Sequence, residues 1–395
     1  MTADDVIRAR KLADIGDENM RVRRWWLVLI TFSVCAEAQI SNPPELSQRL
    51  QSLVDARFVA TKCPGLSVAV ASHNKIILSK AWGKADLEQN VPMTRVSVHR
   101  LASLSKPITG TIIMDLVDQG KLGLDRSIRD YLPELPDSFQ KVRIRHLLSH
   151  ESGVHFAPDD IEVVFSTKHY ATSREALKLI APSPSFEPGS RVEYSSAAFT
   201  LLGAAAEAVT GVSFSRVSTD FLAKHDLPRF RLDDPYALTP NRVRGYLVDR
   251  NSKIELNDGR KLTRDYLSGT PGDVTNAALY DISNRYPAGG FDASAEDLLR
   301  FVIAVGTGKV LPAETVSQMW TAQKTSDGKT SFYGLGWGVS DWKGKTRMVG
   351  MNGLEPSSQT FLRYLPEPGV GVVVLCNAEG AEGLPLDEIV DATMQ

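Results

Sequence analysis

Apolar residues form short alternating or continuous runs near both ends of the chain and follow helical spacing between them. Near the N-terminus, LSVAVASHNKIILSKAWGKAD predicts two strands, 66–72 and 75–82, joined at His73-Asn74. Near the C-terminus, the strand-like stretches are YGLGWGVS, TRMVG, QTFLRYL and VGVVVLC. Because every strand needs a partner, this pattern predicts one sheet assembled from the two ends of the chain.

In the middle of the chain, apolar residues recur at intervals of three and four, the spacing of helices that bury one face. In ITGTIIMDLVDQGKLGL, Ile108, Ile112 and Leu116 lie on one such face. A loop-rich part follows, in which we predict a hairpin of strands at Arg242–Asp249 and Lys253–Leu256.

These elements predict an α/β fold with an all-α lobe. The antiparallel sheet lobe comprises about residues 42–100 and 290–395, and the inserted helical lobe comprises about residues 101–289. Together they make a single catalytic domain, 39–395, that follows an N-terminal extension and signal peptide, 1–38.

The N-terminal pattern is typical of a secretory leader. Arginines within 21–24 precede an apolar run, 25–35, and a small-residue site of the A-x-A type, 36–38, places cleavage before Gln39. The alternative is a membrane anchor, but the run is shorter than the ~20 residues that a spanning helix needs. A start at Met20 would remove only residues before the arginines. We therefore predict an exported protein, periplasmic or extracellular, without a stable membrane span in the mature chain.

Charge and cysteine content narrow the function classes. The net charge is -2 and the basic residues form no long cluster, so we expect no nucleic-acid partner. Removing the leader would take Cys35 with it and leave Cys63 and Cys376, each at one end of a predicted strand. We expect two buried free thiols there, and the alternative is a Cys63–Cys376 disulfide if the two strands pair antiparallel.

The first candidate chemistry is in LASLSKPITG. Residues three apart share a face of a helix, so Ser103 and Lys106 lie side by side, whereas Ser105 points elsewhere. Pro107 fits a first helical turn, which places the start of the helix near Ser103. A lysine removed from water has a lowered pKa and can accept the proton of a serine nucleophile. The alternative is a capping serine beside a lysine that extends into solvent.

The second candidate is in FEPGSRVEYSSAAFTLLG. A Pro-Gly turn precedes Tyr194 and Ser196, and an apolar helix follows them. A tyrosine close to a lysine can shuttle a proton. Taken alone, Tyr194 could equally be a packed aromatic whose hydroxyl finds a partner.

Together these motifs resemble the serine β-lactamase and penicillin-binding protein superfamily. The closest similarity is to its class C-like branch, which includes β-lactamases, D-alanyl-D-alanine carboxypeptidases, esterases and LACTB-type proteases. The resemblance extends from about residue 45 to 390, in family order. It is carried by RLASLSKPITGTIIMDLVDQGKLGLDRSIRDYLPE, VRIRHLLSHESGV, FEPGSRVEYSSAAFTLLGAAAEAVTG, AGGFDASAEDLLRF, YGLGWGV and VGMNGLEPSSQTFLRYLPEPGVGVVVLCN.

The resemblance implies a β-lactamase/transpeptidase-like fold and assigns roles to the two candidates. Ser103 corresponds to the acyl-accepting nucleophile and Lys106 to its partner. Tyr194 matches the tyrosine of the family's Y-x-N motif, and Ser196 stands in the place of the asparagine. A serine keeps a hydrogen-bonding group there but shortens its reach.

The family's third motif, K-T-G or H-x-G, corresponds to Met351-Asn352-Gly353. Gly353 and the amide of Leu354 fit the second oxyanion donor, and the amide of Ser103 fits the first. Met351 carries neither charge nor proton, although the family's lysine or histidine favours substrates with a terminal carboxylate. The resemblance with this departure therefore implies weaker selection for such substrates and makes esters or neutral amides credible ones.

We expect an exported serine hydrolase that cleaves an amide or ester of a small molecule or peptide through an acyl-enzyme. The alternative is a penicillin-binding sensor or a degenerate binding protein without turnover, which Ser196 and Met351 motivate. This reaction implies no metal or organic cofactor. The stretch HESGVH does not predict a zinc site, because its histidines are five residues apart and do not share a helical face. The sequence leaves the substrate and the oligomeric state open.

Overall fold

The computed structural model describes residues 43–157, 160–227, 230–248, 253–255, 261–263 and 274–395. Contacts between residues divide the chain into two units, residues 1–40 and residues 41–395. All helices and strands of the described residues belong to the second unit. The predicted leader, residues 1–38, lies outside the described residues.

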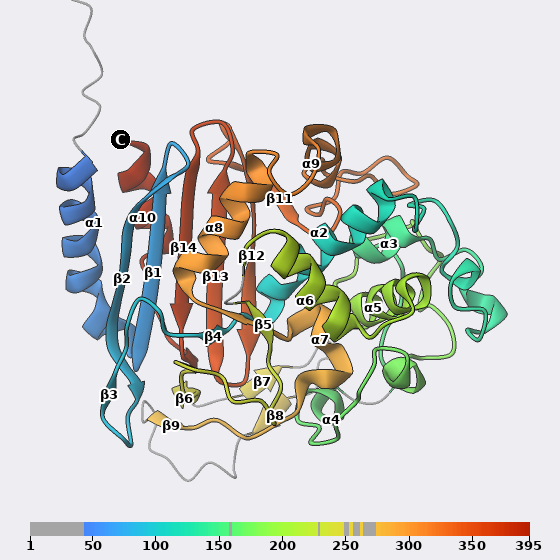
Figure 1. Ribbon diagram of the computed structural model, residues 1–395, viewed down its shortest axis with the longest axis horizontal. Coiled ribbons are helices and arrows are strands. Elements are labelled where there is room, and N and C mark those ends of the chain that lie inside the picture. The colour runs from blue at the N-terminus through green and yellow to red at the C-terminus, as the bar shows by residue number, and fades with distance from the viewer. Residues whose placement is uncertain (1–42, 158–159, 228–229, 249–252, 256–260, 264–273) are drawn as a thin grey trace, which may run out of the picture. The chain divides into compact units, whose positions relative to one another are not determined.

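The largest sheet has seven strands in the order β11-β12-β13-β14-β1-β2-β3 (Figure 1). All neighbours in it pair antiparallel. The first and last long strands, β1 and β14, are neighbours, with Leu66 opposite Cys376, so the predicted sheet from both chain ends is confirmed. The strands are β1 (Gly65–Ser72), β2 (Lys75–Asp86), β3 (Val91–Pro92), β11 (Gly338–Trp342), β12 (Thr346–Glu355), β13 (Ser358–Leu365) and β14 (Val370–Cys376).

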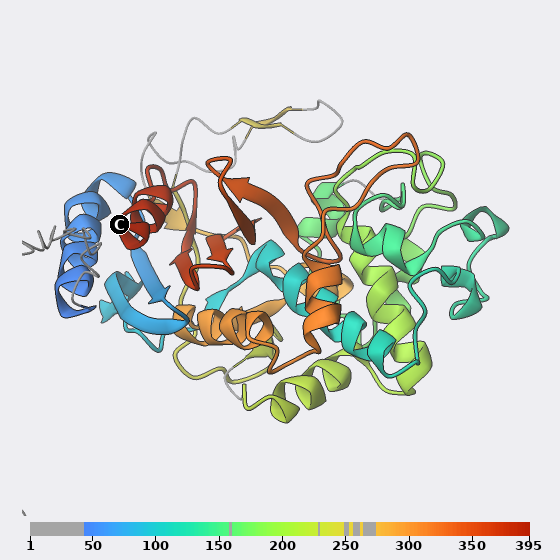
Figure 2. The same ribbon diagram turned by 90° about the horizontal axis from the view of Figure 1, so that it is seen from above.

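Helices cover both faces of this sheet (Figure 2). Side chains alternate along a strand, and every residue of β14 is buried, so its neighbouring residues belong to different cores. Val372 and Val374 pack with one pair of helices, whereas Val373 and Leu375 pack with a third helix on the opposite face. The pair consists of α1 (Pro43–Phe58) and α10 (Leu386–Met394), and the third helix is α8 (Ala295–Gly306).

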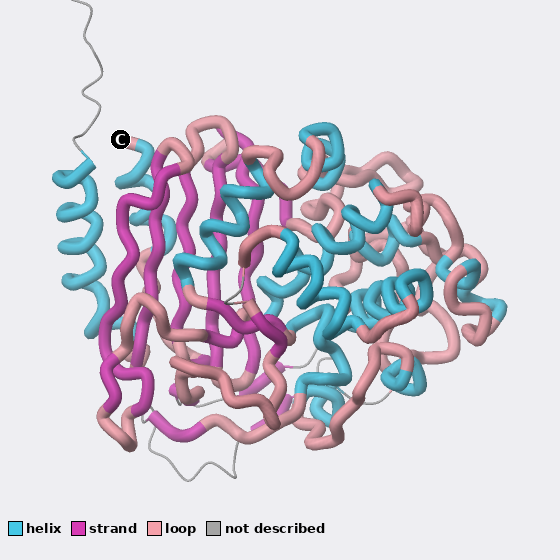
Figure 3. The backbone as a smooth tube through the Cα atoms, viewed as in Figure 1, coloured by secondary structure: helices cyan, strands magenta, loops and turns pink. Residues whose placement is uncertain are grey.

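The remaining helices form the part that continues the α8 core away from the sheet (Figure 3). Along α2, the predicted face of Ile108, Ile112 and Leu116 is buried. Helix α5 is also buried over most of its length; the Ser195 hydroxyl caps its N-terminus, and Gly211 ends it with a positive φ of 74°. These helices are α2 (Ser105–Asp118), α3 (Ile144–Leu148), α4 (Asp160–Val164), α5 (Ser196–Thr210), α6 (Phe214–Lys224), α7 (Tyr286–Gly289) and α9 (Ala313–Met319).

Three small sheets complete the described part, and one of them corrects a prediction. The hairpin expected from Arg242–Asp249 and Lys253–Leu256 is wrong: β6 pairs with β15 and β9, and β7 pairs with β8. Spacing along the chain gave no information about these longer-range partners, and Asp249 and Leu256 lie outside the described residues. The strands are β4 (His99–Arg100), β5 (Arg231–Leu232), β6 (Tyr246–Val248), β7 (Lys253–Glu255), β8 (Lys261–Thr263), β9 (Val274–Asn276), β10 (Phe291–Ala293) and β15 (Ala378–Glu379).

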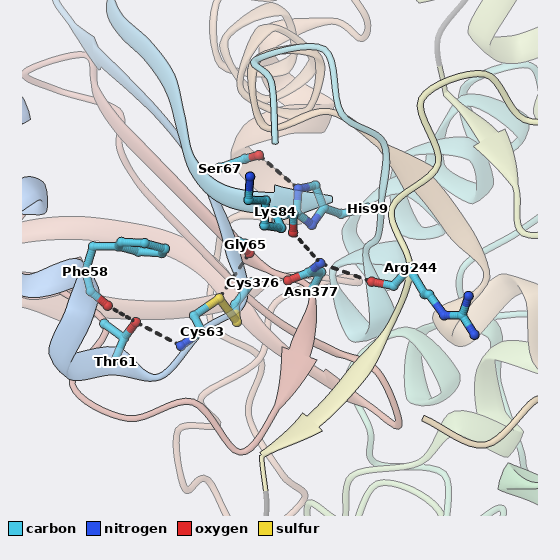
Figure 4. The surroundings of a disulfide bond; sticks show 10 residues. All are labelled: Phe58, Thr61, Cys63, Gly65, Ser67, Lys84, His99, Arg244, Cys376 and Asn377. Atoms are coloured by element: carbon cyan, nitrogen blue, oxygen red, sulfur yellow. Dashed lines mark hydrogen bonds between the residues drawn. A yellow bond between two sulfur atoms is a disulfide. The ribbon is translucent and has the colours of Figure 1, made fainter. Parts of the chain in front are cut away.

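A disulfide joins Cys63 to Cys376, so the expectation of two free thiols is wrong (Figure 4). The antiparallel register of β1 and β14 brings the residues before β1 beside the end of β14, and the two Cα atoms lie 6.0 Å apart. The hydroxyl of Thr61 accepts a hydrogen bond from the amide of Cys63 and donates one to the carbonyl of Phe58. The turn that holds Cys63 is thus fixed on both sides.

Among the described residues, no single helix is both long and apolar enough to cross a membrane. The bent pair of α5 and α6 meets the length and composition criteria only when the two helices are taken together.

Candidate active site

Ser103 lies in a sharp turn that leads into α2. Residues Ala102–Leu104 form a 3-10 helix, and Ala102 has a positive φ of 50°. This left-handed conformation costs about 1–2 kcal/mol for a residue with a side chain. The turn is held from the sheet, because Thr360 on β13 donates a hydrogen bond to the carbonyl of Leu101 at 2.8 Å. The predicted start of the helix near Ser103 is confirmed.

Lys106 is completely buried one turn further on. Its Nζ donates to Ser103 Oγ at 3.2 Å, to Ser196 Oγ at 3.2 Å and to the carbonyl of Ala288 at 2.9 Å. The side chain of Ser105 points elsewhere, since its Oγ accepts a hydrogen bond from the amide of Phe291. The structure therefore brings Ser103, Lys106 and Ser196 together, as predicted, and leaves Ser105 out.

The surroundings of Lys106 favour its neutral form. Burial lowers the pKa of Lys106 to about 7, because the ammonium loses its hydration. The carboxylate of Glu355 raises this pKa and the guanidinium of Arg285 lowers it, so these two residues act in opposite directions. A substantial fraction of Lys106 is thus free to accept a proton at neutral pH.

Tyr194 lies on the other side of Ser103. Its hydroxyl donates to Ser103 Oγ at 2.5 Å, and its ring lies 4.6 Å from Lys106 Nζ. The residue is 41% exposed, so part of its surface is open to solvent. Burial of its hydroxyl raises the pKa of Tyr194 well above the usual range, so the phenol stays protonated at neutral pH.

An aromatic cluster supports Tyr194, and the sequence did not reveal its role. The ring of His150 lies 4.6 Å from that of Tyr194 and 4.5 Å from that of Tyr333, and Phe199 is 5.4 Å away. The Nδ1 of His150 accepts a hydrogen bond from the amide of Ser195, which fixes the backbone next to Tyr194. Burial, reinforced by the positive charge of Lys106, holds the pKa of His150 well below its usual value, so this ring is neutral. The stretch HESGVH contained His150, but its contact with Tyr333 depends on the fold.

Strand β12 brings the third predicted motif next to the turn that holds Ser103. Met351 and Gly353 lie on the face of the sheet that belongs to the α2 and α8 core, and Met351 is 9% exposed. A Cβ added to Gly353 would lie 2.2 Å from Thr360 Oγ1 and 2.6 Å from the carbonyl of Leu101. A glycine is therefore required for β12 to approach this turn.

Asn352 and Leu354 alternate to the opposite side of β12 and are exposed. The side-chain carbonyl of Asn352 accepts a hydrogen bond from Arg363 on β13 at 2.8 Å, so this amide is engaged with the sheet. Leu354 is 59% exposed. Its backbone amide follows Gly353 directly and stays our prediction for an oxyanion donor.

Two further charged residues lie close to Lys106 and were not identified from the sequence. Arg285 Nη2 and Glu355 Oε2 form an ion pair at 2.9 Å, with side chains that are 3% and 10% exposed. Glu355 is the last residue of β12, and Arg285 immediately precedes α7. Arg285 lies outside the stretches that carry the family resemblance, and Glu355 lies within the last of them but was given no role there.

The arrangement can support nucleophilic catalysis. A serine hydroxyl contacts a buried amine of lowered pKa and a protonated phenol, which supplies a nucleophile, a base and an acid within hydrogen-bonding distance. No group of three or more His, Cys, Asp or Glu side chains with metal-binding geometry occurs among the described residues.

Comparisons with known proteins agree with this geometry. Residues 48–392 match the family model described as Beta-lactamase. The human mitochondrial serine beta-lactamase-like protein LACTB is 25% identical over 457 aligned residues, covering 88% of this chain and 78% of LACTB. Esterase EstB from Burkholderia gladioli is 28% identical over 310 residues, covering 74% of this chain and 78% of the esterase.

The fold is also found in solved structures. The D-amino acid amidase from Ochrobactrum anthropi, complexed with L-phenylalanine, superposes with a TM-score of 0.71 at 22% identity, covering 88% of this chain and 97% of the amidase. At this identity the likeness concerns the fold alone, and it confirms the β-lactamase/transpeptidase-like architecture that the motifs predicted.

Proposed function

The chain belongs to the beta-lactamase family of serine hydrolases, and from this premise we propose that it is an exported enzyme that cleaves an ester or amide through a Ser103 acyl-enzyme. The observation that carries the proposal is the contact of one serine with both a fully buried lysine and a tyrosine. Export is supported by the leader pattern of residues 1–38 and by the Cys63–Cys376 disulfide, because such bonds persist in oxidising compartments.

The residues take separate roles in this reaction. Neutral Lys106 accepts the proton of Ser103 as its Oγ attacks the carbonyl carbon of the substrate. The amides of Ser103 and Leu354 stabilise the oxyanion. Tyr194 keeps its proton in the resting site and is placed to pass one to the leaving group. Water activated by Lys106 and Tyr194 then releases the acid and restores the serine.

A fluorophosphonate probe and a fluorescent penicillin test the proposal. We expect the mature protein to be labelled at Ser103 by fluorophosphonate and to hydrolyse an activated ester. Ser103→Ala should abolish the labelling. The matched control is Ser105→Ala, which removes the hydroxyl of the next serine along the chain and should keep the label, because Ser105 Oγ is engaged with the amide of Phe291.

The same experiment separates an enzyme from a binding protein. A penicillin label that persists without ester turnover would favour the sensor alternative that Ser196 and Met351 suggest. Labelling that survives Ser103→Ala would refute the assignment of the nucleophile.

Met351 supports neutral substrates over anionic ones. It occupies the position of the family's lysine or histidine and contributes no positive charge beside the acyl site. The carboxylate of Glu355, on the same face of β12, is partly offset by Arg285 and adds no attraction for an anion. We therefore propose esters or neutral amides as the preferred substrates.

Met351→His should shift this preference toward acyl donors with a free carboxylate. A hydrogen bond to a charged group contributes about 1.5–3 kcal/mol, which corresponds to a change of about tenfold or more in kcat/KM. The measurement compares a neutral ester with its carboxylate-bearing analogue, and Met351→Leu controls for the loss of the methionine side chain. An unchanged ratio in the histidine variant would place the specificity elsewhere in the chain.

A further inference from the structure

Two buried charges near the active site have no role in the proposed reaction. Arg285 ends the 3-10 helix Ile282–Arg285, and Glu355 ends β12. Removing two charges from water costs several kcal/mol for each ion unless their partners compensate. A pair of this kind needs an explanation when it lies beside a catalytic amine.

The guanidinium of Arg285 is fixed on three sides. Its Nη1 donates to the carbonyl of Val163 at 2.8 Å and to the side chain of Asn284 at 3.0 Å. Its Nη2 donates to the carbonyl of Val164 at 3.3 Å and to Glu355 at 2.9 Å. The positive charge is therefore held by two backbone carbonyls at the end of α4 and is aimed at Glu355.

The ion pair connects the two segments that enclose Lys106. Arg285 leads directly into α7, whose residue Ala288 offers its carbonyl to Lys106 Nζ. Glu355 ends the strand in which Gly353 packs against the turn that holds Ser103. The carboxylate also lies against α7, since a Cβ added to Gly289 would be 2.9 Å from Glu355 Oε1.

The other side chains that face Lys106 carry no charge that could act on its amine. Tyr194 contacts Lys106 from the segment before α5 and is a protonated phenol. His150 approaches from the loop after α3 and is neutral, and Tyr333 lies behind these two rings. Phe199 on α5 is apolar, so the charges that act on this amine are those of Arg285 and Glu355.

We propose that the Arg285–Glu355 ion pair is a positioning element of this active site, which holds α7 and the end of β12 around Lys106 and balances the charge that this amine experiences. Glu355 favours the ammonium form and Arg285 favours the free amine. The inference rests on the proposed function, because it assumes that neutral Lys106 is the base for Ser103.

Single and double variants test the balance through the pH dependence of fluorophosphonate labelling and of p-nitrophenyl acetate hydrolysis. Glu355→Gln keeps an acceptor for Arg285 but removes the negative charge, so the acidic limb should move to lower pH by about one unit. Arg285→Met leaves Glu355 unpaired, so the limb should move to higher pH by a similar amount. The double variant should return close to the wild-type midpoint.

The control is the exposed ion pair of Arg216 and Asp220 on α6, whose removal should leave the limb unchanged. Arg285→Lys should move the limb less than Arg285→Met does, because lysine keeps the positive charge without the full geometry of the guanidinium. The proposal would be overturned if the wild type, Glu355→Gln, Arg285→Met and the double variant had equal midpoints, or if the midpoints moved in the opposite directions. A fall in the rates alone would not support it.

A readout that needs no turnover keeps this result separate from the function itself. NMR titration of isotopically labelled lysine side chains in the Ser103→Ala background gives the midpoint of Lys106 directly. The same opposite shifts are expected there. If wild-type labelling by fluorophosphonate does not depend on Ser103, the proposed hydrolase fails, whereas unmoved lysine midpoints show that the ion pair has no such role.

Discussion

Replacing Lys106 with methionine is expected to lower kcat/KM for an activated ester by about 10³-fold, within the range that positioned proton transfer contributes. Methionine has nearly the length of lysine and suits a completely buried site, so the fold should survive. The variant loses the group that accepts the proton of Ser103, together with the donor to Ser196 and Ala288. Steady-state kinetics of the purified variant measure the effect.

The pH profile identifies the base. Burial lowers the pKa of Lys106 to about 7, and only the neutral amine can accept a proton. Activity of the wild-type enzyme should therefore fall about tenfold per unit as pH drops below this midpoint, and it should level off above about pH 8. This limb should be missing in Lys106→Met.

Lys224→Met is the matched control, because it removes an exposed lysine that pairs with Asp115 on the surface. Its rate and its pH profile should equal those of the wild type. An acidic limb that persists in Lys106→Met would mean that a group other than Lys106 titrates there, and it would contradict the proposed roles.

The local part of the site could be predicted because helix geometry fixes it. The spacing of Ser103 and Lys106 places their side chains on one face, and the proline after Lys106 fits the first turn of α2. The same helix geometry showed that Ser105 does not face Lys106, because neighbouring side chains on a helix point in different directions. The position of Tyr194 relative to Ser103 depended on the family's motifs, since the two residues are 91 positions apart.

The supporting contacts could not be predicted, because they join segments that the chain brings together only when it folds. His150 meets Tyr333, and Arg285 meets Glu355, across large separations in sequence and through residue types that are common on protein surfaces. The same reason explains the wrong hairpin, in which β6 found partners near the end of the chain and after residue 273. The hydrophobic periodicity of a segment predicts which of its faces is buried, but not which other segment packs against that face.

The Cys63–Cys376 disulfide depended on a register that the sequence left open. Antiparallel pairing of β1 and β14 was one of several arrangements compatible with two apolar strands. Once Leu66 lies opposite Cys376, the residues just before β1 come within bonding distance of the end of β14. The bond therefore follows from the sheet order, and it ties together the two ends of the chain that build the sheet.

Removing this disulfide should have the largest effect on stability. The two cysteines are 313 positions apart, so the bond closes a very long loop in the unfolded chain. Chain-entropy estimates give about 6 kcal/mol for such a loop, and measured losses for native disulfides are somewhat smaller, about 2–5 kcal/mol. We expect Cys63→Ala/Cys376→Ala to lower the free energy of unfolding by about 3–5 kcal/mol, measured by urea denaturation.

The same change should look small in a thermal scan, because the entropy of unfolding grows with chain length. For a unit of about 350 residues, a loss of about 4 kcal/mol corresponds to a decrease in Tm of about 5 °C. Wild-type protein reduced with dithiothreitol serves as the control and should unfold at the same temperature as the double variant, since both lack the cross-link but share the native register. Equal stability of the oxidised wild type and the double variant would mean that the bond does not constrain the unfolded chain, or that it does not form.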